Sequence, residues 1–115
     1  MKCTIIINEL PYKNDKAWNA LRLAETLLKQ GAGANVFLLE DGVDVGKEDQ
    51  NKQGKDYDLE DIVRNLLAAG VVFLACTTCL KTCGISHEKL IDGVTAGNMA
   101  DLAKWVKESE KVLTF

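Results

Sequence analysis

The apolar residues of this chain gather in short continuous runs that are separated by stretches of helical periodicity. Three runs have the length and composition of buried strands, at residues 3–8, 34–39 and 71–75. Apolar runs without alternation are typical of parallel strands that are covered on both faces. Val94-Thr95 predicts at most a short fourth strand, and residues 111–115 predict a last one.

Between these runs, apolar residues recur every three or four positions, as on one face of a helix. The first such stretch predicts a helix that Asn14 caps and that ends near residue 30, where Gly31 stops it. A second predicted helix is capped by Asp58 and closed by Gly70, and a third is capped by Asn98. A short helical turn is expected at residues 77–84.

Strands and helices therefore alternate along the chain. Such alternation predicts a parallel sheet with helices on both faces, joined by right-handed crossovers. We expect one α/β domain over residues 1–115, with three layers (α/β/α) around a mostly parallel five-stranded sheet. The polar stretch at 40–57 has no periodicity, which predicts a functional or mobile loop at the end of the second strand.

Charge and length narrow the function classes. A net charge of −3 gives no basic footprint for nucleic acid, so no nucleic-acid partner is expected. No apolar stretch approaches the roughly 18 residues that a membrane-spanning helix needs, and the first residues do not read as a signal peptide. We therefore expect a cytoplasmic protein without a membrane partner.

The chemistry of the chain is concentrated in three cysteines within eight residues, Cys76, Cys79 and Cys83, directly after the apolar run at 71–75. Open α/β sheets bind ligands at the carboxyl ends of their strands. Cys76 is expected near the start of a helix, where unpaired N–H groups favour a thiolate, with Lys81 and His87 as nearby cations. In a reducing compartment, clustered cysteines indicate catalysis or metal binding more often than disulfides.

Three interpretations of the cluster stay open. In the first, Cys76 accepts a sulfane sulfur as a persulfide, and Cys79 or Cys83 attacks it and releases the sulfur. In the second, the three thiols and His87 hold zinc or an iron–sulfur cluster, and the sequence leaves the metal open. In the third, Cys76 and Cys79 form a redox pair. The remaining cysteine, Cys3, is expected to be a buried strand residue.

No cofactor is expected. Residues 42–47 contain two glycines and a lysine but lack the spacing and the Ser or Thr of a phosphate-binding loop.

Several motifs taken together resemble the DsrE/DsrF-like sulfur-relay family, and most closely its small YchN-like branch. They extend over nearly the whole chain: Leu10-Pro11-Tyr12, Asn19–Ala24, Asp41-Gly42-Val43, Cys76-Thr77-Thr78-Cys79, Gly84-Ile85-Ser86, Leu90–Val94 and Lys111–Phe115.

The resemblance implies a three-layer α/β/α domain, flavodoxin-like in appearance, that assembles into homo-oligomers, typically trimers or hexamers. It also implies a sulfur carrier or sulfurtransferase that works with sulfur donor and acceptor proteins. The sulfur-accepting cysteine of the family stands nine positions, inclusive, from a glycine, which places Cys76 in that role relative to Gly84. Cys79 matches the second cysteine of the branch. Cys83 replaces the arginine that usually precedes the glycine.

Two further expectations concern shape. The Pro11-Tyr12 and Asp41-Gly42-Val43 loops leave strand ends on the same side of the sheet, so they are expected to shape the pocket. Trp105 and the edge formed by residues 111–115 are expected to be covered by a neighbouring subunit, because a bare strand edge invites aggregation.

Overall fold

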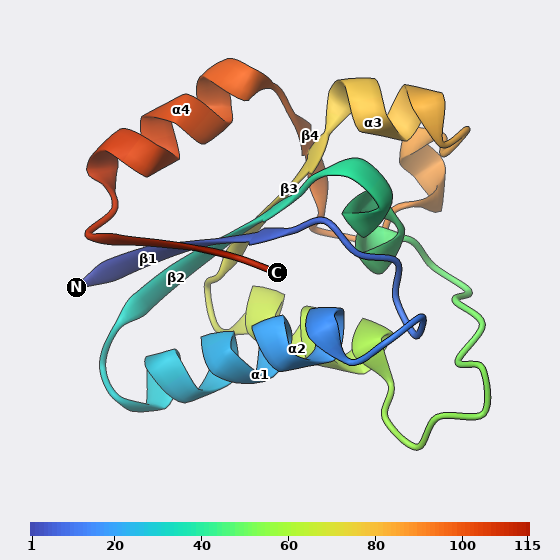
Figure 1. The fold of residues 1–115 in the computed structure, drawn as a ribbon, viewed down its shortest axis with the longest axis horizontal. Coiled ribbons are helices and arrows are strands. Elements are labelled where there is room, and N and C mark those ends of the chain that lie inside the picture. The colour runs from blue at the N-terminus through green and yellow to red at the C-terminus, as the bar shows by residue number, and fades with distance from the viewer.

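Five parallel strands form one sheet, in the order β4-β3-β2-β1-β5, in the computed structural model, which describes residues 1–115. The helices α1 and α2 lie against one face of the sheet, and α3 and α4 lie on the other (Figure 1). The predicted three-layer α/β/α fold is confirmed, and the sheet is parallel throughout. The elements are β1 (Lys2–Ile7), α1 (Lys16–Lys29), β2 (Gly33–Leu38), the 3₁₀ helix η1 (Glu40–Gly46), α2 (Leu59–Ala68), β3 (Val72–Cys76), α3 (Thr77–Thr82), the 3₁₀ helix η2 (His87–Lys89), β4 (Thr95–Gly97), α4 (Met99–Glu108) and β5 (Lys111–Thr114).

The core follows from the register of the central strands. Ile5, Val36 and Phe73 lie side by side across β1, β2 and β3, and all three are fully buried. Side chains alternate between the two faces of a strand. Phe37, the neighbour of Val36, meets Trp105 of α4 edge to face at 6.0 Å between ring centroids. Each face of the sheet therefore has its own apolar layer, and Trp105 packs within its own chain.

Capping hydrogen bonds between residues close in the sequence fix the starts of α2 and α4. Asp58 accepts a hydrogen bond from the backbone N–H of Asp61 at 3.1 Å, as its capping prediction requires. Asn98 and Asp101 form a complete capping box at the start of α4. Helix α1 begins one residue later than predicted, with Asp15 as its N-cap residue, although the Asn14 side chain still accepts from the backbone N–H of Lys16.

The prediction of a continuous loop over residues 40–57 is wrong for its first part. Residues 40–46 form η1, in which Val43 and Val45 are fully buried. Gly42 packs so closely on the end of β1 that a Cβ atom there would overlap the carbonyl group of Ile7. A glycine-containing 3₁₀ turn has no 3.6-residue period, so the sequence pattern could not reveal it.

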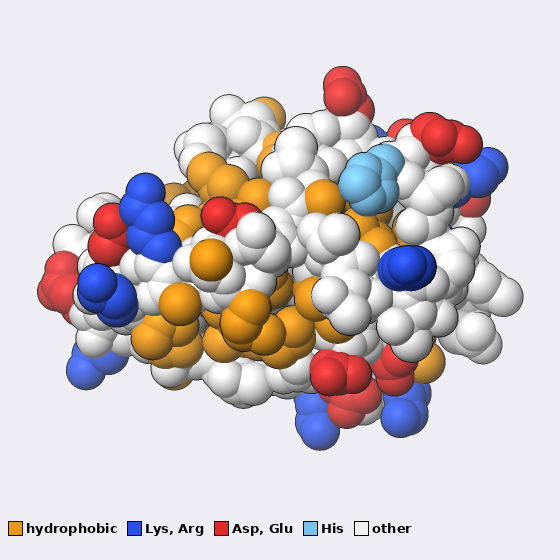
Figure 2. Space-filling model, turned by 90° about the horizontal axis from the view of Figure 1, so that it is seen from above, with side chains coloured by type: hydrophobic (Ala, Val, Ile, Leu, Met, Phe, Trp, Pro, Cys, Tyr) orange, Lys and Arg blue, Asp and Glu red, His pale blue; other side chains and the backbone are white.

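The last strand lies at the edge of the sheet, and β1 is its only partner. All four residues of β5 are exposed, including Val112 and Leu113. Val106 of α4 is 43% exposed and Val112 is 40% exposed. We call the exposed residues Val106, Val112 and Leu113 the α4–β5 surface; Val112 and Leu113 are neighbours in the strand and point to opposite faces of the sheet. Figure 2, which views the molecule from the side of α3 and α4, shows a band of hydrophobic side chains on this side.

A hydroxyl pair closes the connection from α4 into β5. The Oγ1 atom of Thr4 and the Oγ atom of Ser109 lie 2.6 Å apart.

No helix in the structure combines the length and the apolar character that crossing a bilayer requires.

Candidate thiol site

Cys76 occupies the point where the sheet turns into a helix. It is the last residue of β3 and the N-cap residue of α3, so strand and helix follow each other without a loop. Its Sγ atom accepts a hydrogen bond from the backbone N–H of Cys79 at 3.3 Å, and the residue is 7% exposed. The predicted position of Cys76 at a helix start is therefore correct.

Cys79 lies one turn further along α3 and connects Cys76 with η1. Its Sγ atom accepts a hydrogen bond from the backbone N–H of Glu40 at 3.2 Å. Burial raises the pKa of the Cys79 thiol from 9.0 to about 11, and its hydrogen bond with Cys76 acts in the same direction, whereas the Glu40 N–H lowers it. Cys79 therefore remains protonated at neutral pH.

Glu40 itself has a left-handed backbone, with φ of +53°. Residues other than glycine rarely adopt this conformation, and such outliers concentrate at functional sites. The sequence carried no signal for Glu40, because a backbone N–H group of a segment without periodicity provides the contact.

Cys83 ends α3 and is exposed. Partial desolvation of its sulfur raises the pKa of the Cys83 thiol, and the carboxylates of Asp44, Asp41 and Glu40 raise it further. The expected cations are not at the thiols, since Lys81 and His87 line a different hollow along α3, together with Thr77 and Thr78.

The arrangement does not form a metal site. No group of three or more His, Cys, Asp or Glu side chains is placed to hold a metal ion. The Cys79 sulfur contacts η1 through the Glu40 N–H, and the Cys76 sulfur contacts the Cys79 N–H, whereas His87 comes after the turn at Gly84 and lines the α3 hollow. The structure therefore does not bring together the four ligands that the metal interpretation requires.

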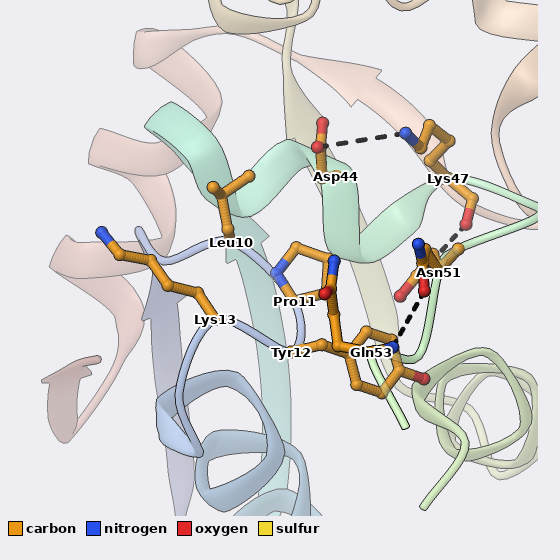
Figure 3. A pocket seen from close by; sticks show the side chains of 9 residues that line it. Leu10, Pro11, Tyr12, Lys13, Asp44, Lys47, Asn51 and Gln53 are labelled. Carbon is orange, nitrogen blue, oxygen red and sulfur yellow. Dashed lines mark hydrogen bonds and ion pairs between the residues drawn. The ribbon is translucent and has the colours of Figure 1, made fainter. Parts of the chain in front are cut away.

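The two loops expected to shape one pocket have different neighbours. The segment of Asp41-Gly42-Val43 belongs to η1 and adjoins the thiols through Glu40. The Pro11-Tyr12 loop lines a hollow of about 470 Å³ with Asp44 and Lys47, and no cysteine is part of its lining (Figure 3). The expectation of one shared pocket is thus wrong, although η1 borders both places.

Two interacting thiols lie at the junction of a central strand and a short helix in a parallel α/β domain. These features define a thiol protein of the three-layer α/β class. The model of the DsrE/DsrF-like family matches residues 1–115, and the chain belongs to this family. Membership implies a function of the sulfur-relay type.

Relatives extend over the full length. The chain is 44% identical over 115 residues to the uncharacterized protein MJ0989 of Methanocaldococcus jannaschii, with 100% of both chains covered. It is 38% identical over 116 residues to protein YchN of Escherichia coli, covering 99% of this chain and 98% of that protein. The crystal structure of YchN superposes with a TM-score of 0.92 at 37% identity, covering 100% of this chain and 99% of that one.

A more distant structure shows the fold alone. MTH1491 of Methanobacterium thermoautotrophicum, a protein of unknown function, has a TM-score of 0.79 at 18% identity, over 99% of this chain and 98% of that one.

Proposed function

We propose that this protein is a cytoplasmic sulfur carrier that accepts sulfane sulfur as a persulfide on Cys76 and passes it to a partner. The main observation behind the proposal is a pair of linked hydrogen bonds to the sulfur atoms at the end of β3. The Cys79 N–H reaches the Cys76 sulfur, and the Glu40 N–H reaches the Cys79 sulfur. Donors directed at a sulfur stabilise its anionic form, which is the nucleophile.

The chemistry needs no external oxidant or reductant. The Cys76 thiolate attacks the outer sulfur of a donor persulfide, R–S–S⁻. The S–S bond of the donor breaks, a new S–S bond forms on Cys76, and R–S⁻ leaves. An acceptor thiolate then removes the outer sulfur in the same way and restores the Cys76 thiolate. Donor and acceptor proteins are therefore the expected partners.

Cys79 is the preferred second thiol. Because burial and Cys76 keep it protonated, it can donate S–H to the persulfide while the sulfur is held. If Cys79 loses this proton, it can attack the inner sulfur on Cys76 and expel HS⁻, which leaves a Cys76–Cys79 disulfide. Cys83 is exposed at the far end of α3 and offers a second route of release.

The test is the intact mass of the protein after incubation with inorganic polysulfide. The wild type should gain one sulfur, about 32 Da, which a reductant removes. Cys76→Ser should gain none, whereas Cys3→Ser is the matched control, since Cys3 is 1% exposed in β1. A gain that persists in Cys76→Ser would contradict the assignment.

The contact between the two thiols also favours a second candidate, a thiol-redox module. In that case the same measurement yields the loss of two hydrogen masses, which signals a Cys76–Cys79 disulfide, and no sulfur gain.

The proposal includes assembly into a homo-oligomer, a trimer or hexamer. The α4–β5 surface supports it, because Val106, Val112 and Leu113 expose apolar area beside the open backbone edge of β5. Natural proteins protect such edges, and a neighbouring subunit would cover this one.

A further inference from the structure

The thiol cluster opens to solvent at the Cys83 end of α3. Cys76 is 7% exposed, Cys79 is half-buried and Cys83 is exposed. The backbone N–H of Cys83 donates to the carbonyl oxygen of Cys79 at 2.9 Å, so these two residues lie one helical turn apart. Side chains four positions apart share one face of a helix. A partner that exchanges sulfur with the cluster therefore meets Cys83 first on this face of α3.

The 3₁₀ helix η1 lies beside the same face of α3. The backbone N–H of Glu40 donates to the Cys79 sulfur at 3.2 Å, which holds the start of η1 close to Cys83. This short helix carries the carboxylates of Glu40, Asp41 and Asp44. Besides the partial desolvation of the Cys83 sulfur, the negative charges of all three raise the pKa of its thiol, and no cation opposes them.

The carboxylates of η1 are poorly neutralised. Glu40 and Asp41 are exposed and take part in no ion pair. Asp44 has one cationic partner, Lys47, in a long ion pair of 4.0 Å (Figure 3). The surface beside Cys83 therefore carries more negative than positive charge.

The cations nearest in sequence lie on the opposite side of α3. Lys81 precedes Cys83 by two residues, which places the two on opposite sides of a helix with about 3.6 residues per turn. Lys81 and His87 line the hollow on that other side, together with Thr77 and Thr78. The thiols therefore face the carboxylates of η1 and not the cations of their own helix.

This charge distribution affects any partner in sulfur exchange, because the partner brings an anionic sulfur. A donor brings a persulfide anion and an acceptor brings a thiolate. The η1 carboxylates repel a free anion of either kind. A partner with Lys or Arg side chains beside its reactive sulfur reverses the sign of this interaction, and complementary charge also speeds the encounter.

We infer that the protein that exchanges sulfur with this site presents a basic surface around its reactive cysteine, and that this surface docks on Glu40, Asp41 and Asp44 beside Cys83. The inference rests on the proposed function, since sulfur exchange at this site is part of that proposal. Glu40 and Asp41 are then specificity-determining residues, whose side chains select the charge of the partner without touching the transferred sulfur.

Two thiol reagents of opposite charge test this selection without sulfur transfer. One is trimethylammonioethyl methanethiosulfonate, a cation, and the other is sulfonatoethyl methanethiosulfonate, an anion. The Cys83 thiolate attacks the thio sulfur of either reagent, a disulfide forms and methanesulfinate leaves. Peptide mass spectrometry gives the rate at Cys83. Each rate is divided by the rate of the same reagent with mercaptoethanol, which cancels the difference in intrinsic reactivity.

At low salt, the normalised rate of the cationic reagent should exceed that of the anionic reagent. The ratio of the two should fall about threefold in Asp41→Asn and in Glu40→Gln, because each change removes one negative charge. It should also fall in about 1 M salt, where charges are screened within about 3 Å. Glu25→Gln is the matched control, with the same change of charge on α1, across the sheet from α3 (Figure 1). Its ratio should equal that of the wild type.

The inference is overturned if the ratio in the wild type is one or less, or if Asp41→Asn and Glu40→Gln leave it unchanged. Loading of Cys76 by inorganic polysulfide is measured in parallel. If Cys76 takes up sulfur while the ratio does not respond to these variants, the basic partner is wrong and the carrier function stands. If the ratio falls as expected and Cys76 takes up no sulfur, the preference for a cationic partner stands and the carrier function fails.

Discussion

Replacing Gly42 by alanine tests how η1 positions the thiol site. The backbone of Gly42 does not have a positive φ, so alanine is conformationally allowed there. The cost comes from packing alone. The added Cβ atom would overlap the carbonyl oxygen of Ile7, lie 2.6 Å from its carbonyl carbon and 3.2 Å from the backbone nitrogen of Asn8. These are backbone atoms at the end of a central strand, so they cannot rotate away as a side chain would.

The magnitude follows from these contacts. Overpacking a close-packed interior costs about 1–3 kcal/mol, and rigid neighbours place this site at the upper end of the range. The chain can relieve the overlap by moving η1 away from β1. Such a shift would separate the Glu40 N–H from the Cys79 sulfur, now 3.2 Å apart. We therefore expect lower stability together with altered thiol reactivity in the same variant.

Urea unfolding and the rate of thiol alkylation measure the two effects. Gly33→Ala is the matched control, because a Cβ atom at Gly33 meets no atom closer than 3.8 Å. That variant should be neutral or slightly more stable, since alanine restricts the unfolded chain. If Gly42→Ala unfolds at the wild-type urea concentration and alkylates at the wild-type rate, η1 does not position the thiols as described.

Three other predictions concern the pKa of Cys79, the exposed edge strand β5 and the Tyr12 hydroxyl in the loop after β1. Because the pKa of Cys79 rises from 9.0 to about 11 on folding, the unfolded chain loses this proton first, and the free energy of unfolding should fall between those pH values. The urea midpoint should fall less steeply with pH in Cys79→Ser than in the wild type. Equal slopes in the two proteins would contradict the raised pKa of Cys79. Val112→Lys should convert the proposed homo-oligomer to monomers in sedimentation velocity, and an unchanged assembly would exclude the α4–β5 surface as the interface. Tyr12→Phe should cost about 1–3 kcal/mol in urea unfolding, because the buried N–H of Leu59 loses its partner; no loss would mean that water replaces the hydroxyl.

The parts of the fold that depend on local chemistry could be predicted from the sequence. Asp58 and Asn98 cap their helices through side chains that bond to backbone only three residues away. The apolar runs of β1, β2 and β3 could be predicted as strands because most of their residues are buried on both faces of the sheet, which produces continuous apolar runs. The position of Cys76 at the helix start follows from the same local logic, since it directly ends an apolar run.

The parts of the fold and of the thiol site that depend on contacts between distant segments could not be predicted from the sequence. η1 is held by Gly42 against Ile7, a contact between segments that no periodicity connects. The acidic neighbours of Cys83 come from that same helix, so the electrostatics of the third thiol were invisible in the sequence around it. The Glu40 N–H is a backbone group, and residue identity does not encode where it points.

The order of the sheet has a consequence for synthesis. Of the five strands of this sheet β1 is made first, yet it becomes an interior strand, and its two neighbours are β2 and β5, the strand of the sheet that is made last. Cys3 pairs with Lys111 and Ile6 with Thr114, and Thr4 reaches the Ser109 hydroxyl, so these contacts join residues more than a hundred positions apart. Until residues 111–114 emerge, one side of β1 presents unpaired backbone groups in an apolar strand. The native sheet therefore cannot close around β1 until β5 has been made.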